Sequence, residues 1–87
     1  MLQIDFKFGT FEEAMDVLGE MFKIMKKNKV VSYADLYSLV NKKEPISSEY
    51  YKFGWTNLFY SKVEPYGKNM WVIRMPELIK LEKKLEI

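Results

Sequence analysis

The most informative part of this chain is Phe53-Gly54-Trp55-Thr56-Asn57-Leu58, together with the strand-like segment that follows it. A glycine directly before a tryptophan indicates either a backbone with positive φ or a close approach of two chain segments. Burying an indole beside such a glycine is a common way to lock a small core. We therefore interpret Gly54 and Trp55 as structural, and not as a binding site.

The segment that follows predicts a β-hairpin. Val63 and Trp71-Val72-Ile73 have the composition of strands, and Pro65 to Asn69 supply the turn-forming residues of a connecting loop. Alternate residues of the second strand, from Trp71 to Met75, share one face. Pro76 closes the hairpin, so we assign Trp71 and Pro76 to the same structural motif as Gly54 and Trp55.

Upstream, alternating apolar residues predict a strand over Ile4 to Phe8, and a capping box of Thr10 and Glu13 begins a helix that runs to about Lys27. Apolar residues recur along this helix at i, i+3 and i+4 spacing. They are Phe11, Ala14, Met15, Leu18, Met21, Phe22 and Met25. We interpret this stripe as core, with a methionine-rich groove for a partner as the alternative.

Three further helical segments are predicted. A capping box of Ser32 and Asp35 begins a short helix over Tyr33 to about Val40. Ser47 or Ser48 caps a helical turn that ends before Gly54. The tail over residues 76–87 carries Leu78, Leu81 and Leu85 at helical spacing, which predicts a C-terminal helix or a loosely docked tail.

These elements predict one α+β domain over residues 1–87, in which a small antiparallel sheet packs on the helices. A three-stranded sheet is favoured, with the N-terminal strand beside the hairpin. The alternative is a winged helix-turn-helix, with residues 47–58 as the recognition helix and residues 62–74 as the wing.

Composition excludes several kinds of chemistry. The 87 residues are 48% hydrophobic and 16% aromatic, typical of a folded domain, and include neither cysteine nor histidine. Zinc sites with thiolate or imidazole ligands and His-based catalysis are therefore excluded. The acids are scattered and no glycine-rich phosphate loop is present, so we expect no metal, no nucleotide cofactor and no enzymatic activity. The absence of cysteine, of a signal peptide and of a long apolar run predicts a cytoplasmic protein without membrane contact.

Three motifs resemble those of a group of small proteins encoded by phages and prophages of Gram-positive bacteria. The motifs are Phe11-Glu12-Glu13-Ala14, the segment Val31 to Val40 (V-S-x-A-D-L-Y-x-L-V in the group), and Phe53 to Leu58 (Y-G-W-T-D-L), before a hairpin that ends in Met75-Pro76. The chain departs from the group at Asn28-Lys29 and at Asn41, where glycine is usual, and at Asn69-Met70. The resemblance implies a phage or prophage context and no particular activity.

Two functions are left open. The first is a protein-interaction or accessory module that binds an unknown partner or itself, since exposed aromatic residues favour interfaces. The second is nucleic-acid binding. Residues 42–74 hold six bases and three acids, with tyrosines Tyr50, Tyr51, Tyr60 and Tyr66 interleaved among them. The candidate nucleic-acid contacts are Lys42, Lys43, Lys52, Lys62, Lys68 and Arg74.

Overall fold

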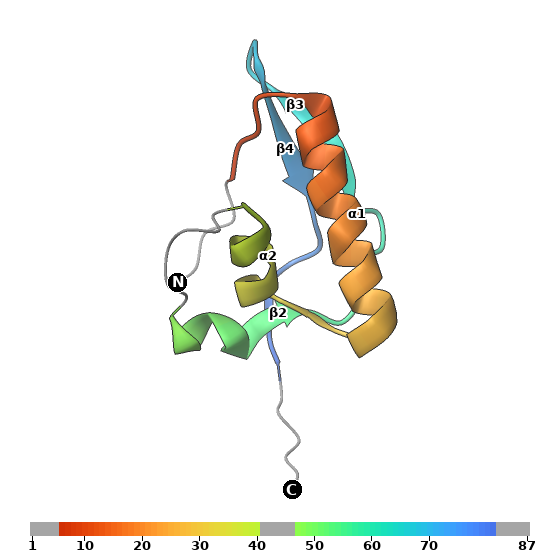
Figure 1. Ribbon diagram of the computed structural model, residues 1–87, viewed down its shortest axis with the longest axis vertical. Helices are drawn as coiled ribbons and strands as arrows, with labels where there is room; N and C mark the ends of the chain where they lie inside the picture. Colours follow the sequence, from red (N-terminus) through yellow and green to blue (C-terminus); the bar gives the residue numbers. More distant parts are fainter. Residues whose placement is uncertain (1–5, 41–46, 82–87) are drawn as a thin grey trace, which may run out of the picture.

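The computed structural model describes residues 6–40 and 47–81 (Figure 1). The elements, in chain order, are α1 Phe11–Asn28, β1 Val31–Ser32, α2 Tyr33–Val40, the 3-10 helix η1 Ser48–Lys52, β2 Phe53–Trp55, β3 Lys62–Tyr66, β4 Met70–Arg74 and β5 Ile79–Lys80. The strands form two antiparallel sheets, one of three strands in the order β1-β2-β5 and one of the two strands β3 and β4. The predicted α+β class, with small antiparallel sheets packed on helices, is confirmed.

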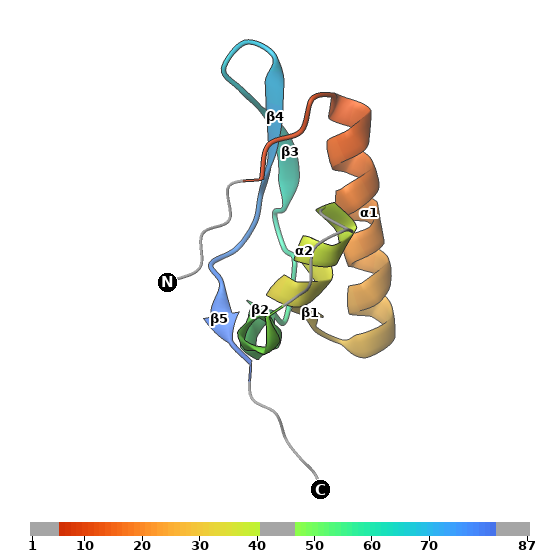
Figure 2. The ribbon, with the colours of Figure 1, turned by 60° about the vertical axis from the view of Figure 1, so that its left-hand side comes forward.

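The two sheets occupy opposite ends of α1. Figure 2 shows the β3-β4 hairpin as one layer and α1 as the next, with β2 and β5 near the other end. α1 lines both parts of the core. Ala14 and Leu18 pack with Ile73 of the hairpin, whereas Met21 packs with Trp55 of the three-stranded sheet. One long helix therefore holds two small sheets together, neither of which is large enough to bury a core alone.

Local sequence signals set the ends of the helices. The Thr10 hydroxyl accepts a hydrogen bond from the Glu13 amide at 3.0 Å, and the Glu13 carboxylate accepts from the Gly9 amide at 3.3 Å. Ser32 and Asp35 form the second predicted box, with backbone-to-side-chain bonds of 2.9 and 3.1 Å. Both capping boxes, and with them the starts of α1 and α2, are confirmed.

The prediction that the whole apolar stripe of α1 is buried is wrong for three residues. Phe11, Met15 and Phe22 are 42%, 43% and 47% exposed. Val17 and Ile24, on the other side of the stripe, pack against the core instead. The reason is the width of the covering layer: a two-stranded hairpin and α2 cover one side of α1 and leave the other side open.

The hairpin is longer than predicted. β3 extends through Pro65 and Tyr66, which we assigned to the connecting loop, and the turn is reduced to residues 67–69. Proline is accepted in β3 because this is an edge strand. Phe8 pairs with Trp71 through two backbone hydrogen bonds of 2.8 and 2.9 Å, so the end of the N-terminal segment lies beside the hairpin. This contact is an isolated bridge and residues 6 and 7 form no strand, so the described residues do not form the predicted three-stranded sheet of this segment and the hairpin. Residues 4 and 5 of the predicted strand lie outside the described residues.

The short helical turn predicted after Ser47 is confirmed, whereas the longer recognition helix of the winged-helix alternative is wrong. η1 is a five-residue 3-10 helix, capped by Ser47, and the chain enters β2 at Phe53, so no recognition helix spans residues 47–58. The winged-helix alternative fails at this point. The predicted C-terminal helix is wrong over its described part, because after Pro76 the chain forms β5, which pairs with β2. Pairing satisfies its backbone and places Leu78 against the core, which an isolated short helix could not achieve. Residues 82–87 of this prediction lie outside the described residues.

Gly54 explains why β2 can be the central strand. A Cβ atom at this position would collide with the Val31 carbonyl oxygen and would lie 2.7 Å from the Ser32 Cα and 3.0 Å from a Leu81 methyl carbon. Gly67 is the glycine with a positive φ in the described ranges, so close approach, not φ, is what requires glycine at position 54. Both neighbouring strands approach at this point.

Candidate interaction surfaces

The six predicted nucleic-acid contacts do not form one surface. Residues 42 and 43 lie outside the described ranges. Lys52 ends η1, near the three-stranded sheet, whereas Lys62, Lys68 and Arg74 belong to the hairpin. The four tyrosines interleaved with these bases are likewise not gathered on one surface. Tyr50 is half-buried and packs edge-on against Tyr33 at 4.9 Å between ring centroids, so part of its ring is already in contact within the protein. The other three, Tyr51, Tyr60 and Tyr66, are 54%, 94% and 52% exposed.

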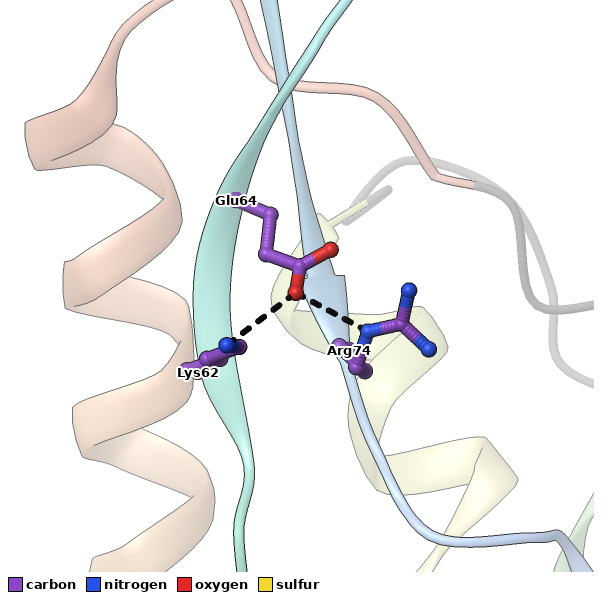
Figure 3. A network of polar contacts seen from close by, with 3 residues as sticks. All are labelled: Lys62, Glu64 and Arg74. Carbon is purple, nitrogen blue, oxygen red and sulfur yellow. Dashed lines mark hydrogen bonds and ion pairs between the residues drawn. The ribbon is translucent and has the colours of Figure 1, made fainter.

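Two of the hairpin cations are paired with one acid. The Glu64 carboxylate accepts a hydrogen bond from Arg74 Nε at 2.9 Å and lies 3.4 Å from Lys62 Nζ (Figure 3). The pairing register explains the arrangement, because Lys62 is directly opposite Arg74 on adjacent strands. The Arg74 hydrogen bond, more than any other contact, holds the pKa of Glu64 below its usual value, and Lys62 acts in the same direction. These cations are therefore partly neutralised before any phosphate arrives.

Replacing Arg74 with glutamine is expected to raise the pKa of Glu64 toward the ordinary value for glutamate. Because the pKa is lowered in the folded protein, the stabilisation from this ion pair is present above the unfolded pKa and is lost as the pH falls through the folded pKa. An NMR titration of the Glu64 carboxyl carbon in both proteins measures the shift. Lys62→Gln is the matched comparison, with a smaller rise expected. An unchanged Glu64 pKa in Arg74→Gln would contradict the assignment.

The same side of the hairpin carries a shallow groove of about 460 Å³. Lys7, Glu64, Tyr66, Val72 and Arg74 are among its lining residues. The Lys7 ammonium lies 5.0 Å from the centre of the Tyr66 ring, a cation–π contact. The groove thus has a modest positive charge, and each charged group named here already has a partner within the protein. Nucleic-acid binding therefore stays a prediction made from the sequence.

The loop between β2 and β3 presents two aromatic side chains on a tight turn. The Ser61 amide donates to the Leu58 carbonyl at 3.1 Å, which closes a four-residue turn with Phe59 and Tyr60 at its two central positions. Leu58 is buried and fixes the turn to the core, and the Asn57 side chain accepts from the Phe59 amide at 3.1 Å. Phe59 and Tyr60 are 69% and 94% exposed. We call residues 58–61 the aromatic turn.

Tyr60 has a backbone conformation that tyrosine rarely adopts. Its φ is 66°, in the left-handed region that glycine enters freely and other residues enter at a cost of about 1–2 kcal/mol. The third residue of a four-residue turn with positive φ is normally glycine or asparagine. The chain therefore carries a strained tyrosine at a position where the side chain contributes almost no burial. Strain of this kind gathers at functional sites.

A second exposed apolar surface lies on α1. Phe11, Met15 and Phe22 project from one side of the helix, and we call these three residues the α1 stripe. The Phe11 ring packs edge-on against the Trp71 ring at 5.2 Å, which joins the N-terminal end of the stripe to the hairpin. Gly19, between Met15 and Phe22, leaves open space where a Cβ would stand. Sequence periodicity identified these residues as apolar but placed them in the core.

The outer edge of the hairpin is unsuited to strand addition. The backbone N–H and C=O of Trp71 both bond to Phe8, on the side of β4 that faces away from β3. Trp71 and its partner in β3, Pro65, are therefore a pair without hydrogen bonds between them. The Pro65 nitrogen therefore points to the open edge of β3, where a further strand would need an N–H donor that proline lacks. Pro65 thus blocks pairing at this edge, as prolines on natural edge strands do.

No protein-family model matches the sequence, and no curated protein or solved structure is similar enough to match it. The resemblance to phage and prophage proteins stays a prediction of the motifs. Among residues 6–40 and 47–81, no three side chains of the metal-ligating types lie close enough together to hold an ion. No helix in these ranges is long and apolar enough to cross a membrane. What the described surface offers is exposed aromatic area on a small α+β fold.

Proposed function

We propose that this protein is a non-catalytic protein-interaction module and that the aromatic turn is its main contact with a protein partner. The observation that carries the proposal is Tyr60, which is 94% exposed and has a left-handed backbone. Strained backbone gathers at functional sites, and the almost fully exposed Tyr60 side chain gains no packing within the fold that would offset the strain. Tyrosine and other large aromatic residues are the usual anchors of protein interfaces.

The turn is suited to this role because it is fixed before a partner arrives. Its backbone bond from Ser61 to Leu58 and the Asn57 side-chain bond to the Phe59 amide hold the loop, and the buried Leu58 attaches it to the core. Less conformational entropy is then lost on binding than for a flexible loop. The motif resemblance supports an accessory role in a phage or prophage, and the cysteine-free composition supports a cytoplasmic location.

Photo-cross-linking tests the proposal directly. p-Benzoylphenylalanine replaces Tyr60 in one variant and Tyr51, which is also exposed but lies on η1, in a matched control. In cells that carry the gene, we expect the probe at position 60 to cross-link to a protein and the probe at position 51 not to do so. Cross-links to nucleic acid alone would overturn the proposal in favour of the nucleic-acid hypothesis. The absence of any cross-link at position 60 would also overturn it.

The variant Tyr60→Gly separates binding from folding. Glycine relieves the left-handed strain, and this gain is partly offset by the greater entropy of glycine in the unfolded chain. We expect the free energy of unfolding to stay the same or to rise by up to about 1 kcal/mol, while partner binding is lost. Urea denaturation measures the first effect, and co-purification with the cross-linked partner measures the second. A loss of stability above about 1 kcal/mol would show that Tyr60 packs against the fold.

A further inference from the structure

We propose that the α1 stripe binds a second copy of this chain, in an antiparallel pair of α1 helices that crosses near Gly19. This interface is separate from the aromatic turn and adds self-association to the proposed function. The stripe is apolar, exposed along α1 and open beside Gly19, where a Cβ would have no neighbour within 4 Å. A second copy fits because this surface, turned about a two-fold axis, is complementary to itself in both its apolar side chains and its charges.

The apolar side chains form one compact line. With 100° per residue, Phe11, Met15 and Phe22 lie within about 40° of one another around the helix axis. Met15 and Phe22 are two helical turns apart, and the point midway between them is next to Gly19. A two-fold axis at this point sets Met15 of each copy against Phe22 of the other, as a closed, isologous interface requires. The missing side chain of Gly19 lets the two helix backbones approach closely at the crossing.

The charges select the antiparallel direction. The first turn of α1 carries the acids Glu12 and Glu13, and its last turn carries Lys26 and Lys27. About the same two-fold axis, Glu12 of one copy lies close to Lys26 of the other, twice per dimer, on the border of the stripe. A parallel pair would place Glu12 beside Glu12 and lysine beside lysine. Exposed ion pairs add little affinity, but they discriminate strongly between orientations.

The alternatives on the described surface are less favourable for self-association. Pro65 blocks strand addition at the outer edge of the hairpin, and the groove above the hairpin is lined by groups that already have internal partners. The α1 stripe is small compared with the interface of a permanent dimer, so we expect a dimer that dissociates on dilution.

Sedimentation velocity of the purified full chain over a range of concentrations tests the inference. We expect a monomer–dimer equilibrium that Phe22→Glu weakens at least tenfold, whereas Tyr51→Glu, on η1, leaves it unchanged. Glu12→Lys and Lys26→Glu should each weaken the dimer, and the double variant should restore it, because the charges again oppose each other across the interface. Circular dichroism confirms that each variant is folded, and the restored double variant excludes misfolding as the cause.

Gly19→Ala adds a readout with opposite signs. Alanine at this exposed helix position should raise the melting temperature of the dilute monomer, because alanine favours the helix over glycine, while it weakens the dimer by filling the crossing point. A monomer at every concentration, or a dimer that Phe22→Glu does not affect, would overturn the inference. Either result leaves the aromatic turn untouched, since its test is the cross-link at position 60 and Tyr60→Gly should not change the monomer–dimer equilibrium.

Discussion

Trp55→Ala is expected to lower the free energy of unfolding by about 3–5 kcal/mol, the range for removing a fully buried tryptophan. Trp55 is 1% exposed and belongs to the core cluster that also contains Met21 and Leu36. A small domain is stabilised by only about 5–15 kcal/mol in total, so this loss consumes a large share. Urea denaturation followed by circular dichroism measures the change.

The indole also makes a hydrogen bond that a smaller change can isolate. Its Nε1–H donates to the Pro76 carbonyl at 2.7 Å and ties β2 to the segment that leads into β5. Trp55→Phe keeps most of the apolar ring but leaves this carbonyl without its donor, at an expected cost of about 1–3 kcal/mol. If the alanine variant melts like the parent, Trp55 is not a core residue and the description of the three-stranded sheet is wrong.

Gly54→Ala is expected to destabilise the protein by about 3 kcal/mol, at the upper end of the range for overpacking. The added methyl group would meet the Val31 carbonyl oxygen and the Ser32 Cα, which are backbone atoms of the paired strand β1 and cannot rotate away as a side chain would. To accept alanine, β1 and β2 must separate. Faster amide hydrogen exchange at Phe53 and Trp55 than in the parent would locate the damage.

Gly9→Ala is the matched control for this variant. A Cβ at position 9 meets only a Glu13 carboxylate oxygen, at 3.9 Å, which is ordinary contact. We expect its free energy of unfolding to change by less than about 0.5 kcal/mol. Equal stability of Gly54→Ala and Gly9→Ala would contradict the close approach of β1 and β2.

Signals that act within a few residues were readable from the sequence. The boxes of Thr10 with Glu13 and of Ser32 with Asp35 set the starts of α1 and α2 correctly, because a capping box satisfies backbone amides next to it in the chain. Strand pairing across the hairpin was also anticipated. A glycine with a structural role was expected at position 54, although the sequence left two reasons for it open.

Hydrophobic spacing gives wrong predictions where the outcome depends on which segment packs against the residues. The spacing of Leu78 and Leu81 fits a helix, but β2 offers an open edge at Gly54, and the chain pairs there as β5. Helical spacing also placed Phe11, Met15 and Phe22 in the core, because periodicity reports that a stripe is apolar and not how wide a layer covers it. The exposure and the left-handed φ of Tyr60 have no local sequence signal, since glycine or asparagine is the usual residue in this conformation.

Capping, periodicity and turn residues act through neighbouring positions, and from them the sequence predicts the α+β class, the two helices and the hairpin. Which apolar side chains stay exposed depends on the packing of distant segments. A hairpin of two strands is too narrow to cover the whole apolar side of α1, and the turn at Leu58 directs Phe59 and Tyr60 away from the core. Burial depends on the surfaces that meet, and those surfaces come from segments far apart in the chain.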